Sequence, residues 1–189
     1  EYFNQKDKPY WYIDTHAGAG CYSLDEAFVR KNAEFEDGVG RLLGRKDVPK
    51  ELKSYLKLVR DLNESGKLRL YPGSPCCAAP LLREEDRMRL FELHPADRRL
   101  LQKTFDEAGS KAIVLEQDGF TGINAFLPPP TRRALVLIDP PYEIKTDYRT
   151  VLAALKECLR RFATGTYVVW YPKLHSMQSR ELPDKLKRL

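Results

Sequence analysis

Residues 138–142, Ile-Asp-Pro-Pro-Tyr, combine groups that could hold the amino group of a nucleobase. Consecutive prolines restrict the backbone and lack N–H donors, so the carbonyl of Pro140 is free to accept a hydrogen bond from a ligand. The Asp139 carboxylate is a second acceptor, an exocyclic NH₂ group offers two donors, and the Tyr142 ring could stack on a base. The pattern indicates a pocket for a flipped-out base, although a capping aspartate in a rigid turn would use the same residues.

Acidic residues end, or closely follow, four strand-like apolar runs. They are Asp14, Glu92, Asp118 and Asp139. In an open parallel sheet, ligands bind beyond the carboxyl ends of the strands. One such acid would usually be a helix cap or a turn residue, whereas four in succession predict a binding site at that edge of the sheet.

The first apolar run leads into a glycine-containing turn, Asp14 to Gly20, with the sequence Asp-Thr-His-Ala-Gly-Ala-Gly. Its glycines allow a tight turn and a close approach of the backbone to a ligand. The turn lacks the third glycine of the dinucleotide fingerprint, and Glu92 lies far beyond the spacing of about 20 residues expected for the ribose-binding acid. Taken alone, the turn is better explained as an ordinary strand–helix loop.

The elements that must position these residues alternate along the chain. Unbroken apolar runs, typical of strands buried on both faces, occur at 10–13, 89–91, 112–115, 134–138 and 167–170. Between them, apolar residues recur at helical spacing over 100–108 and 151–162. The alternation predicts an α/β fold of the Rossmann-like type, with a doubly wound, mostly parallel sheet.

Residues 24–65 interrupt this alternation with a helical pattern, broken by a turn at 46–49. We interpret them as a helical insertion subdomain between the first two strands of one domain that covers residues 1–189. A length of 189 residues is normal for one domain with a sizeable core.

Composition narrows the class of protein without identifying a partner. The net charge is +5, but residues 173–189 supply +3 of it through five Lys/Arg against two acids, so nucleic-acid binding is only plausible. No apolar run approaches the 18–20 residues or so that span a bilayer, and the first residues resemble no signal or transit peptide. Four cysteines without a C-x-x-C pair favour reduced thiols in a cytoplasmic protein, and we expect no metal.

The Asp-Pro-Pro-Tyr segment resembles motif IV of the class I S-adenosylmethionine-dependent amino-methyltransferases, and Asp14 to Gly20 resembles their motif I. Nearly the whole chain is similar to the RlmJ family of bacterial 23S ribosomal RNA adenine-N6 methyltransferases. Further strings that carry this resemblance are Tyr71-Pro72-Gly73-Ser74-Pro75, Glu92-Leu93-His94-Pro95, Asp118-Gly119-Phe120 and Trp170-Tyr171-Pro172. The resemblance implies methyl transfer from S-adenosylmethionine to N6 of an adenine in ribosomal RNA.

Site residues follow from the resemblance by position. The residues that fall on cofactor contacts are Asp14, His16, Gly18, Ser74, Glu92, Asp118 and Gly119. Glu92 would bind the ribose hydroxyls of the cofactor and Asp118 its adenine amino group. Asp139 falls on the catalytic acceptor, with Pro140 and Tyr142 beside the target base. His16 and Ser74 could equally be loop residues that satisfy nearby backbone groups, and His94-Pro95 is better explained as the start of a helix.

The resemblance also implies that the family chain has a histidine-rich segment before Glu1 and further strands after Leu189. Two other functions stay open: a DNA adenine-N6 methyltransferase, and a nucleic-acid-binding protein without catalysis that serves the use of external DNA. A protein-glutamine methyltransferase is less favoured because such enzymes usually carry Asn at the position of Asp139. Arg132-Arg133 and Arg160-Arg161 could contact phosphates, although exposed basic pairs usually face solvent. A monomer is favoured, without a residue pattern that decides it.

Overall fold

A five-stranded parallel sheet forms the centre of the computed structural model, which describes residues 1–24 and 35–189. The strands lie in the order β5-β4-β1-β6-β7, and every neighbouring pair is parallel. Their bounds are β1 Trp11–Asp14, β4 Arg87–Phe91, β5 Ile113–Leu115, β6 Ala134–Ile138 and β7 Thr166–Val169. The chain order reverses on the two sides of β1, so the predicted doubly wound α/β fold is confirmed.

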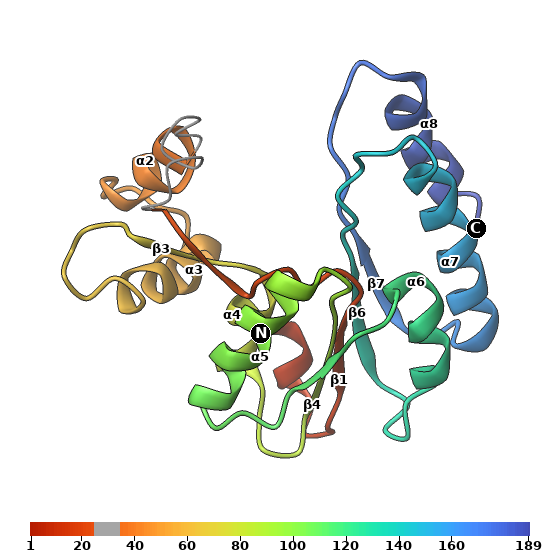
Figure 1. Ribbon diagram of the computed structural model, residues 1–189, viewed down its shortest axis with the longest axis horizontal. Helices are drawn as coiled ribbons and strands as arrows, with labels where there is room; N and C mark the ends of the chain where they lie inside the picture. The colour runs from red at the N-terminus through yellow and green to blue at the C-terminus, as the bar shows by residue number, and fades with distance from the viewer. Residues whose placement is uncertain (25–34) are drawn as a thin grey trace.

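Helices cover both faces of this sheet (Figure 1). One face carries α4 (Ser74–Ala78), η3 (Ala79–Leu81) and α5 (Pro95–Glu107). The other carries α6 (Gly119–Gly122), η4 (Ile123–Phe126), α7 (Asp147–Arg161) and α8 (Met177–Leu186). Within residues 1–24 and 35–189, none of the helices is both long and apolar enough to cross a bilayer.

Successive side chains of the strands pack into separate cores on the two faces. Tyr12 lies with Leu101 of α5 in one core, and its neighbour Ile13 lies in the other with Val151 of α7. Side chains of a strand alternate between faces, so a strand covered on both sides needs apolar residues at consecutive positions. This explains why the strands appear in the sequence as unbroken apolar runs.

The strand ends differ from the predicted ones by one or two residues. β1 includes Asp14, β4 begins at Arg87 instead of 89, and β7 ends at Val169, one residue before Trp170. Hydrogen bonding to the neighbouring strand defines these ends, and Arg87 is paired with Trp11 although its side chain is charged. Side-chain polarity alone therefore misplaced them.

Helices also form in the segment predicted as a helical insertion, as far as the structure describes it. They are η2 (Glu36–Gly40), α2 (Arg41–Leu43) and α3 (Lys50–Asp61). These helices share a small core around Val39, Leu56 and Val59. Residues 25–34, which the prediction also includes, lie outside the described residues.

A two-stranded antiparallel ribbon joins this insertion to the sheet domain. Its strands are β2 (Cys21–Ser23) and β3 (Leu70–Pro72). The turn between α3 and β3 is closed by Asn63, whose side-chain amide donates to the carbonyls of Val59 and Leu70. This ribbon was not predicted, because three-residue strands are too short to show a periodic pattern in the sequence.

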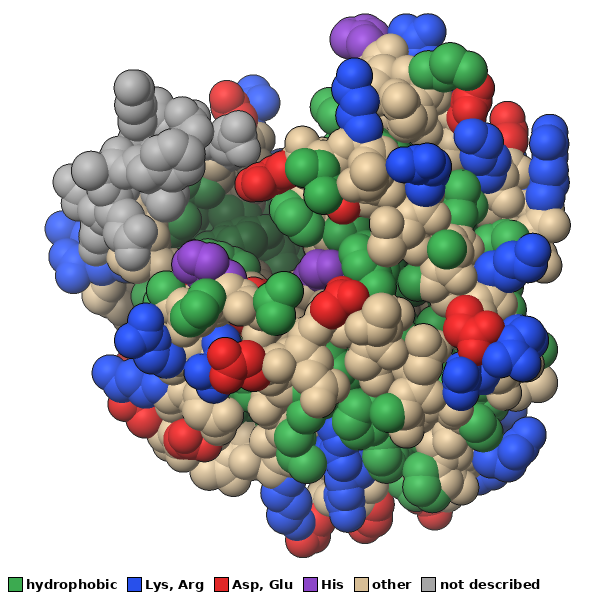
Figure 2. All heavy atoms as spheres, turned by 45° about the vertical axis from the view of Figure 1, so that its right-hand side comes forward, with side chains coloured by type: hydrophobic (Ala, Val, Ile, Leu, Met, Phe, Trp, Pro, Cys, Tyr) green, Lys and Arg blue, Asp and Glu red, His purple; other side chains and the backbone are tan. Residues whose placement is uncertain are grey.

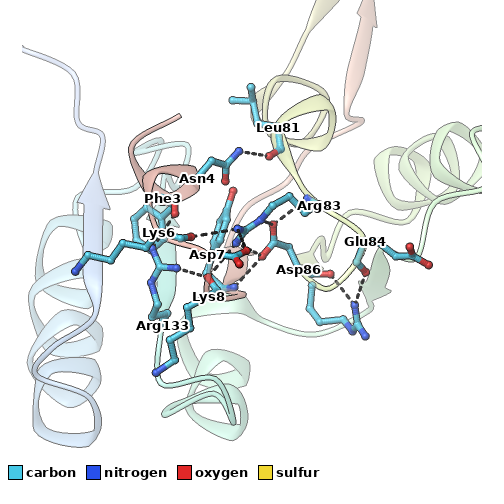
Figure 3. A network of polar contacts seen from close by, with 12 residues as sticks. Phe3, Asn4, Lys6, Asp7, Lys8, Leu81, Arg83, Glu84, Asp86 and Arg133 are labelled. Atoms are coloured by element: carbon cyan, nitrogen blue, oxygen red, sulfur yellow. Dashed lines mark hydrogen bonds and ion pairs between the residues drawn. The ribbon is translucent and has the colours of Figure 1, made fainter.

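The amino-terminal segment begins with η1 (Tyr2–Gln5). Hydrogen bonds hold it against the sheet at the amino ends of the strands (Figure 3). The Arg83 guanidinium donates to the buried Asp86 carboxylate at 3.0 Å and to the carbonyl of Lys8 at 2.9 Å. Arg133, just before β6, donates to the carbonyls of Lys8 and Phe3. These bonds hold residues 1–10 at the amino ends of the strands.

Candidate functional site

A cavity of about 810 Å³ lies beyond the carboxyl ends of β1, β4, β6 and β7. Its lining residues are His16, Gly18, Tyr22, Glu92, Leu93, His94, Pro95, Asp97, Asp139, Pro140, Pro141, Glu143 and Trp170. Figure 2 shows a hollow in the molecular surface, with apolar side chains behind it and histidine and acidic side chains along its lower edge. Parallel strands bring residues distant in sequence to this one edge, and of the four predicted acids Glu92 and Asp139 line the cavity.

Asp14, the last residue of β1, is fully buried beneath this cavity. Its Oδ2 accepts hydrogen bonds from the Ser74 hydroxyl at 2.6 Å and the Tyr12 hydroxyl at 2.9 Å. Its Oδ1 accepts from the backbone N–H of His16 at 3.2 Å. Burial raises the pKa of Asp14, and these hydrogen bonds offset part of the rise. Asp14 therefore joins the β1 turn to the start of α4 instead of facing the cavity.

Gly18 forms the part of the turn that lies against Glu92. Its φ of +59° is in the left-handed region, and a Cβ there would lie 2.0 Å from the Tyr22 hydroxyl oxygen. Its backbone N–H donates to Glu92 Oε2 at 2.8 Å, and the N–H of His94 donates to Glu92 Oε1 at 2.7 Å. Glu92 thus ties the loops after β1 and β4 together at the wall of the cavity.

His16 lines the cavity with a neutral ring at neutral pH. Burial lowers the pKa of His16 to about 4, and the charge of Asp118 offsets only part of that shift. The ring Nδ1 lies 2.8 Å from the Thr15 hydroxyl, and the ring packs edge-on against Phe120 at 4.7 Å between centroids. His16 is therefore an uncharged group that can accept or donate one hydrogen bond.

Asp118 and Gly119 lie beside the β1 turn, outside the set of residues that line the cavity. Asp118 caps α6, with Oδ1 accepting from the Phe120 N–H at 3.0 Å. A Cβ at Gly119 would lie 2.0 Å from the carbonyl oxygen of Thr15, so only glycine permits this approach. The structure gives both residues a local role at the start of α6, and their predicted cofactor contacts stay predictions.

Asp139 and Pro140 face the cavity directly after β6. Burial raises the pKa of Asp139 to about 6, and the charge of Asp14 adds to the rise. Among the residues that the structure describes, both causes of this shift, burial and the Asp14 charge, disfavour the ionised carboxylate. A partly desolvated carboxylate in a cavity is suited to accept hydrogen bonds or a proton from a ligand.

Tyr142 is buried, whereas a residue that stacks on a base needs an exposed ring face. Only 8% of it is exposed, and its ring packs against Tyr148 with centroids 4.7 Å apart. Its φ is +55°, and its hydroxyl donates to the carbonyl of Trp170 at 2.8 Å. Its stacking role stays a prediction, since Tyr142 is absent from the residues that line the cavity.

Trp170 and Tyr22 line the cavity although the sequence analysis assigned them no role. Trp170 is the last residue of the predicted run 167–170 and directly follows β7, and 52% of it is exposed. An aromatic residue at the carboxyl end of a predicted strand was the available signal. Tyr22 carried no such signal because β2 itself was not predicted.

His94, the Arg160-Arg161 pair and the cysteines, which the sequence also singled out, have structural partners. His94 caps α5, its ring accepting from the Asp97 N–H, so the helix-start interpretation is confirmed. Arg160 and Arg161 both pair with Glu157 on α7. The four cysteines are free thiols, and Cys21 Sγ donates to Cys76 Sγ at 2.8 Å. Among the residues that the structure describes, no group of three or more His, Cys, Asp or Glu side chains could hold a metal ion.

Comparison with known proteins gives consistent matches over nearly the whole chain. A family model described as "Ribosomal RNA large subunit methyltransferase D, RlmJ" matches residues 7–189. Ribosomal RNA large subunit methyltransferase J of Escherichia coli strain K12 is 47% identical over 187 residues, or 99% of this chain. Its counterpart in Haemophilus influenzae is 45% identical over 179 residues, or 94% of this chain. The chain spans 66% and 63% of the lengths of these two relatives.

Solved structures extend the comparison to the fold. A crystal structure of a Legionella pneumophila protein has a TM-score of 0.91 at 35% identity, covering 99% of this chain and 68% of its own. A Clostridium thermocellum protein described as a candidate rRNA methylase has a TM-score of 0.51 at 12% identity, covering 98% of this chain and 75% of its own. The second likeness concerns the fold alone, and it agrees with the Rossmann-like sheet described above.

Proposed function

Because the chain belongs to the RlmJ family of ribosomal RNA large subunit methyltransferases, we propose that it methylates N6 of an adenine in ribosomal RNA, with S-adenosylmethionine as the methyl donor. One observation carries the proposal. Asp139 with Pro140 and the Gly18 turn with Glu92 line one cavity, although they follow three different strands. A site for methyl transfer to an amino group must hold the methyl donor and the amino group that receives the methyl next to each other, so it needs a methyl-donor side and a methyl-acceptor side.

The residues that follow the carboxyl ends of β1 and β4 fit the side of the site that would bind the methyl donor. Gly18 lets the backbone approach a ligand without a side chain between them, and Glu92 presents carboxylate oxygens to the cavity. Each of those oxygens accepts one backbone N–H and retains capacity for a second donor such as a ribose hydroxyl. Ser74 acts indirectly, by holding Asp14 and thereby the turn. When bound, S-adenosylmethionine supplies an electrophilic methyl group.

Asp139 and Pro140 would act on the methyl acceptor, which is the amino group of the target adenine. The amino nitrogen of adenine is a poor nucleophile because its lone pair is delocalised into the ring. Hydrogen bonds from the two N6 hydrogens to the Asp139 carboxylate and the Pro140 carbonyl favour a more tetrahedral nitrogen and localise the lone pair. The reaction then depends on positioning and charge stabilisation more than on a strong base. Asp139 can take the proton that the nitrogen releases, since its pKa lies near 6.

The direct test is methyl incorporation from radiolabelled S-adenosylmethionine into deproteinised large-subunit ribosomal RNA, with identification of N6-methyladenosine in the digested product. We expect Asp139→Ala to lower the rate by roughly 10²–10⁴-fold, because it removes one acceptor and the proton acceptor together. Cofactor affinity, measured by calorimetry, should change little. Asp184→Asn, at an exposed carboxylate on α8, is the matched control and should retain the rate.

Three outcomes would contradict the proposal. Absence of cofactor binding would exclude a methyltransferase and favour a binding protein. Faster methylation of adenine in DNA than in RNA would favour the DNA enzyme. Near-normal turnover by Asp139→Ala would remove Asp139 from the catalytic step.

A further inference from the structure

Two cysteine thiols meet at the base of the insertion, where the ribbon of β2 and β3 leaves the sheet domain (Figure 1). Cys21 is the first residue of β2, and Cys76 lies on α4, which follows β3. Their Sγ atoms are 2.8 Å apart, although the two residues are 55 positions apart in the sequence. Both are free, partly exposed thiols. A disulfide has an S–S distance of about 2.05 Å, so the sulfur atoms need to approach by only about 0.8 Å.

The backbone around the two thiols is already joined. The N–H of Gly73, just before α4, donates to the carbonyl of Gly20 at 2.7 Å, and Gly20 directly precedes Cys21. Gly20 has a φ of +79°, and a Cβ there would lie 3.7 Å from Cys76 Sγ. The glycine turn and the start of α4 therefore hold the two thiols in contact.

The other two cysteines have different surroundings. Cys158 is fully buried on α7, in the core on the other face of the sheet. Cys77 follows Cys76 on α4, and its thiol lies 3.9 Å from the carbonyl of Pro72. Successive side chains of an α-helix point about 100° apart, so Cys76 and Cys77 direct their thiols differently. The geometry therefore selects one pair among the four cysteines.

We propose that Cys21 and Cys76 form a redox-active dithiol, which hydrogen peroxide oxidises to an intramolecular disulfide that closes the base of the insertion. The bond would covalently join the two ends of residues 22–75, a segment that contains the helices η2, α2 and α3. This inference goes beyond methyl transfer and does not depend on it, since neither thiol is among the residues that line the cavity.

The oxidation balances with one molecule of peroxide. The Cys21 thiolate attacks one peroxide oxygen, so an S–O bond forms as the O–O bond breaks, and the released hydroxide takes up a proton as water. The Cys76 sulfur then loses its proton and attacks Cys21. The S–S bond forms as the S–O bond breaks, and a second water leaves. The two thiols together lose two electrons, which the peroxide gains.

The contact between the thiols also indicates which of them reacts first. Once Cys21 is ionised, the Cys76 thiol donates a hydrogen bond to it. This hydrogen bond lowers the pKa of Cys21 and outweighs the opposing effect of burial. The thiolate is the nucleophile of the pair, so Cys21 attacks the peroxide and Cys76 resolves the product.

Peptide mapping by mass spectrometry tests the pairing on the wild-type protein. Reduced protein, freed of reductant, is treated with hydrogen peroxide, alkylated, and digested without reductant. We expect the loss of two of the four thiols, a mass lower by two hydrogen atoms, and one peptide pair that links Cys21 to Cys76. Dithiothreitol should restore all four thiols.

Thermal unfolding tests what the bond does. Closing a loop of this length should raise the Tm of the oxidised protein by roughly 5–15 °C over the reduced protein. Cys76→Ser should show no rise, and its oxidation should stop at a sulfenic acid on Cys21, which dimedone labels. Cys77→Ser, at the neighbouring position of α4, is the matched control and should gain Tm as the wild type does.

The inference is overturned if peroxide leaves all four thiols intact, or if the linked peptides join another pair of cysteines or two separate chains. An equal gain in Tm by Cys76→Ser, or a dimedone label on Cys77 in that variant, would also overturn it. Mapping of the wild-type protein decides the pairing even if Cys76→Ser does not fold. Failure of the proposed function is a separate result, because methyl incorporation is measured on the reduced protein.

Discussion

At the scale of single residues, the charge state of Asp139 is the most consequential property of the site. Burial and the neighbouring Asp14 charge raise the pKa of Asp139 to about 6, while burial lowers the pKa of His16 to about 4. At neutral pH the cavity therefore contains an ionised Asp139 and an uncharged His16. In this charge state the Asp139 carboxylate can accept from an amino group, and the His16 ring carries no positive charge that would compete for it.

This charge state predicts a pH profile. Under the proposed function Asp139 accepts hydrogen bonds from N6 and then its proton, and only the ionised carboxylate can take that proton. We therefore expect kcat/KM to fall as the pH decreases through about 6 and to level off above it. Asp139→Asn removes the titrating group, and its residual rate should be independent of pH in that range. The measurement is methyl incorporation across buffers of constant ionic strength. A wild-type profile that is flat down to the ordinary aspartate pKa of about 4 would show that the shift is absent or does not control the rate.

At the scale of elements, the site depends on the close approach of helix starts to the β1 turn. Ser74 at the start of α4 bonds to Asp14, and Gly119 at the start of α6 lies against the Thr15 carbonyl. Neither contact needs a ligand. The two helices fix the turn from the two faces of the sheet, which gives the cavity its shape before a cofactor binds.

Gly119→Ala tests this element-scale packing. A Cβ at 2.0 Å from a backbone oxygen cannot be accommodated by a side-chain rotation, so α6 or the β1 turn must move. We expect a loss of about 2–4 kcal/mol in the free energy of unfolding, together with weaker cofactor binding. Gly44→Ala is the control, because its nearest atom is 4.0 Å away and its backbone is helical, and it should be close to neutral. Denaturant unfolding and calorimetric titration would measure both effects, and an unchanged unfolding midpoint for Gly119→Ala would refute the packing argument.

At the scale of the whole molecule, the two ends of the parallel strands differ in what they carry: one has the candidate site and the other a network of structural hydrogen bonds. The carboxyl edge carries the cavity, and the amino edge carries the network of Arg83, Asp86 and Arg133 that ties down the first ten residues (Figure 3). Asp86 accepts from the Tyr10 N–H at 2.8 Å, so it couples the amino-terminal segment to the loop before β4. Stability at this edge should be independent of the chemistry at the other.

Asp86→Ala should therefore destabilise the fold by about 3 kcal/mol without altering the cavity, because it removes the buried carboxylate that pairs with Arg83 and accepts from the Tyr10 N–H. Burial alone would raise the pKa of Asp86, but hydrogen bonds from Arg83 and from the backbone outweigh it and lower the pKa. A lowered pKa means that the contribution is present above the unfolded-state value near 4 and is lost as the pH falls below it. The measurement is the free energy of unfolding by denaturant, for the wild type and for Asp86→Ala, at a series of acidic pH values. The difference between the two proteins should shrink as the pH falls. A difference that grows as the pH falls would contradict it.

The extent of prediction from sequence differs between the fold and the site. The five strands, the helical insertion and the glycine turn were recognisable, because burial on two faces and helical spacing leave local patterns. The ribbon of β2 and β3 was not, since three residues carry no period. The cavity position of Asp139 followed from its place after a strand, whereas the exposure of Trp170 and the burial of Tyr142 did not.

By itself, the amino-acid sequence determined the parallel sheet, the edge at which its acids gather and the family to which those motifs point. All of these depend on residues near one another in the chain, where apolar spacing and backbone restrictions act directly. Only the tertiary structure decided that Ser74 bonds to Asp14, that Glu92 joins two loops and that the indole of Trp170 faces the cavity beside Asp139. Those facts depend on which surfaces meet when distant elements pack, and local patterns carry no record of that geometry.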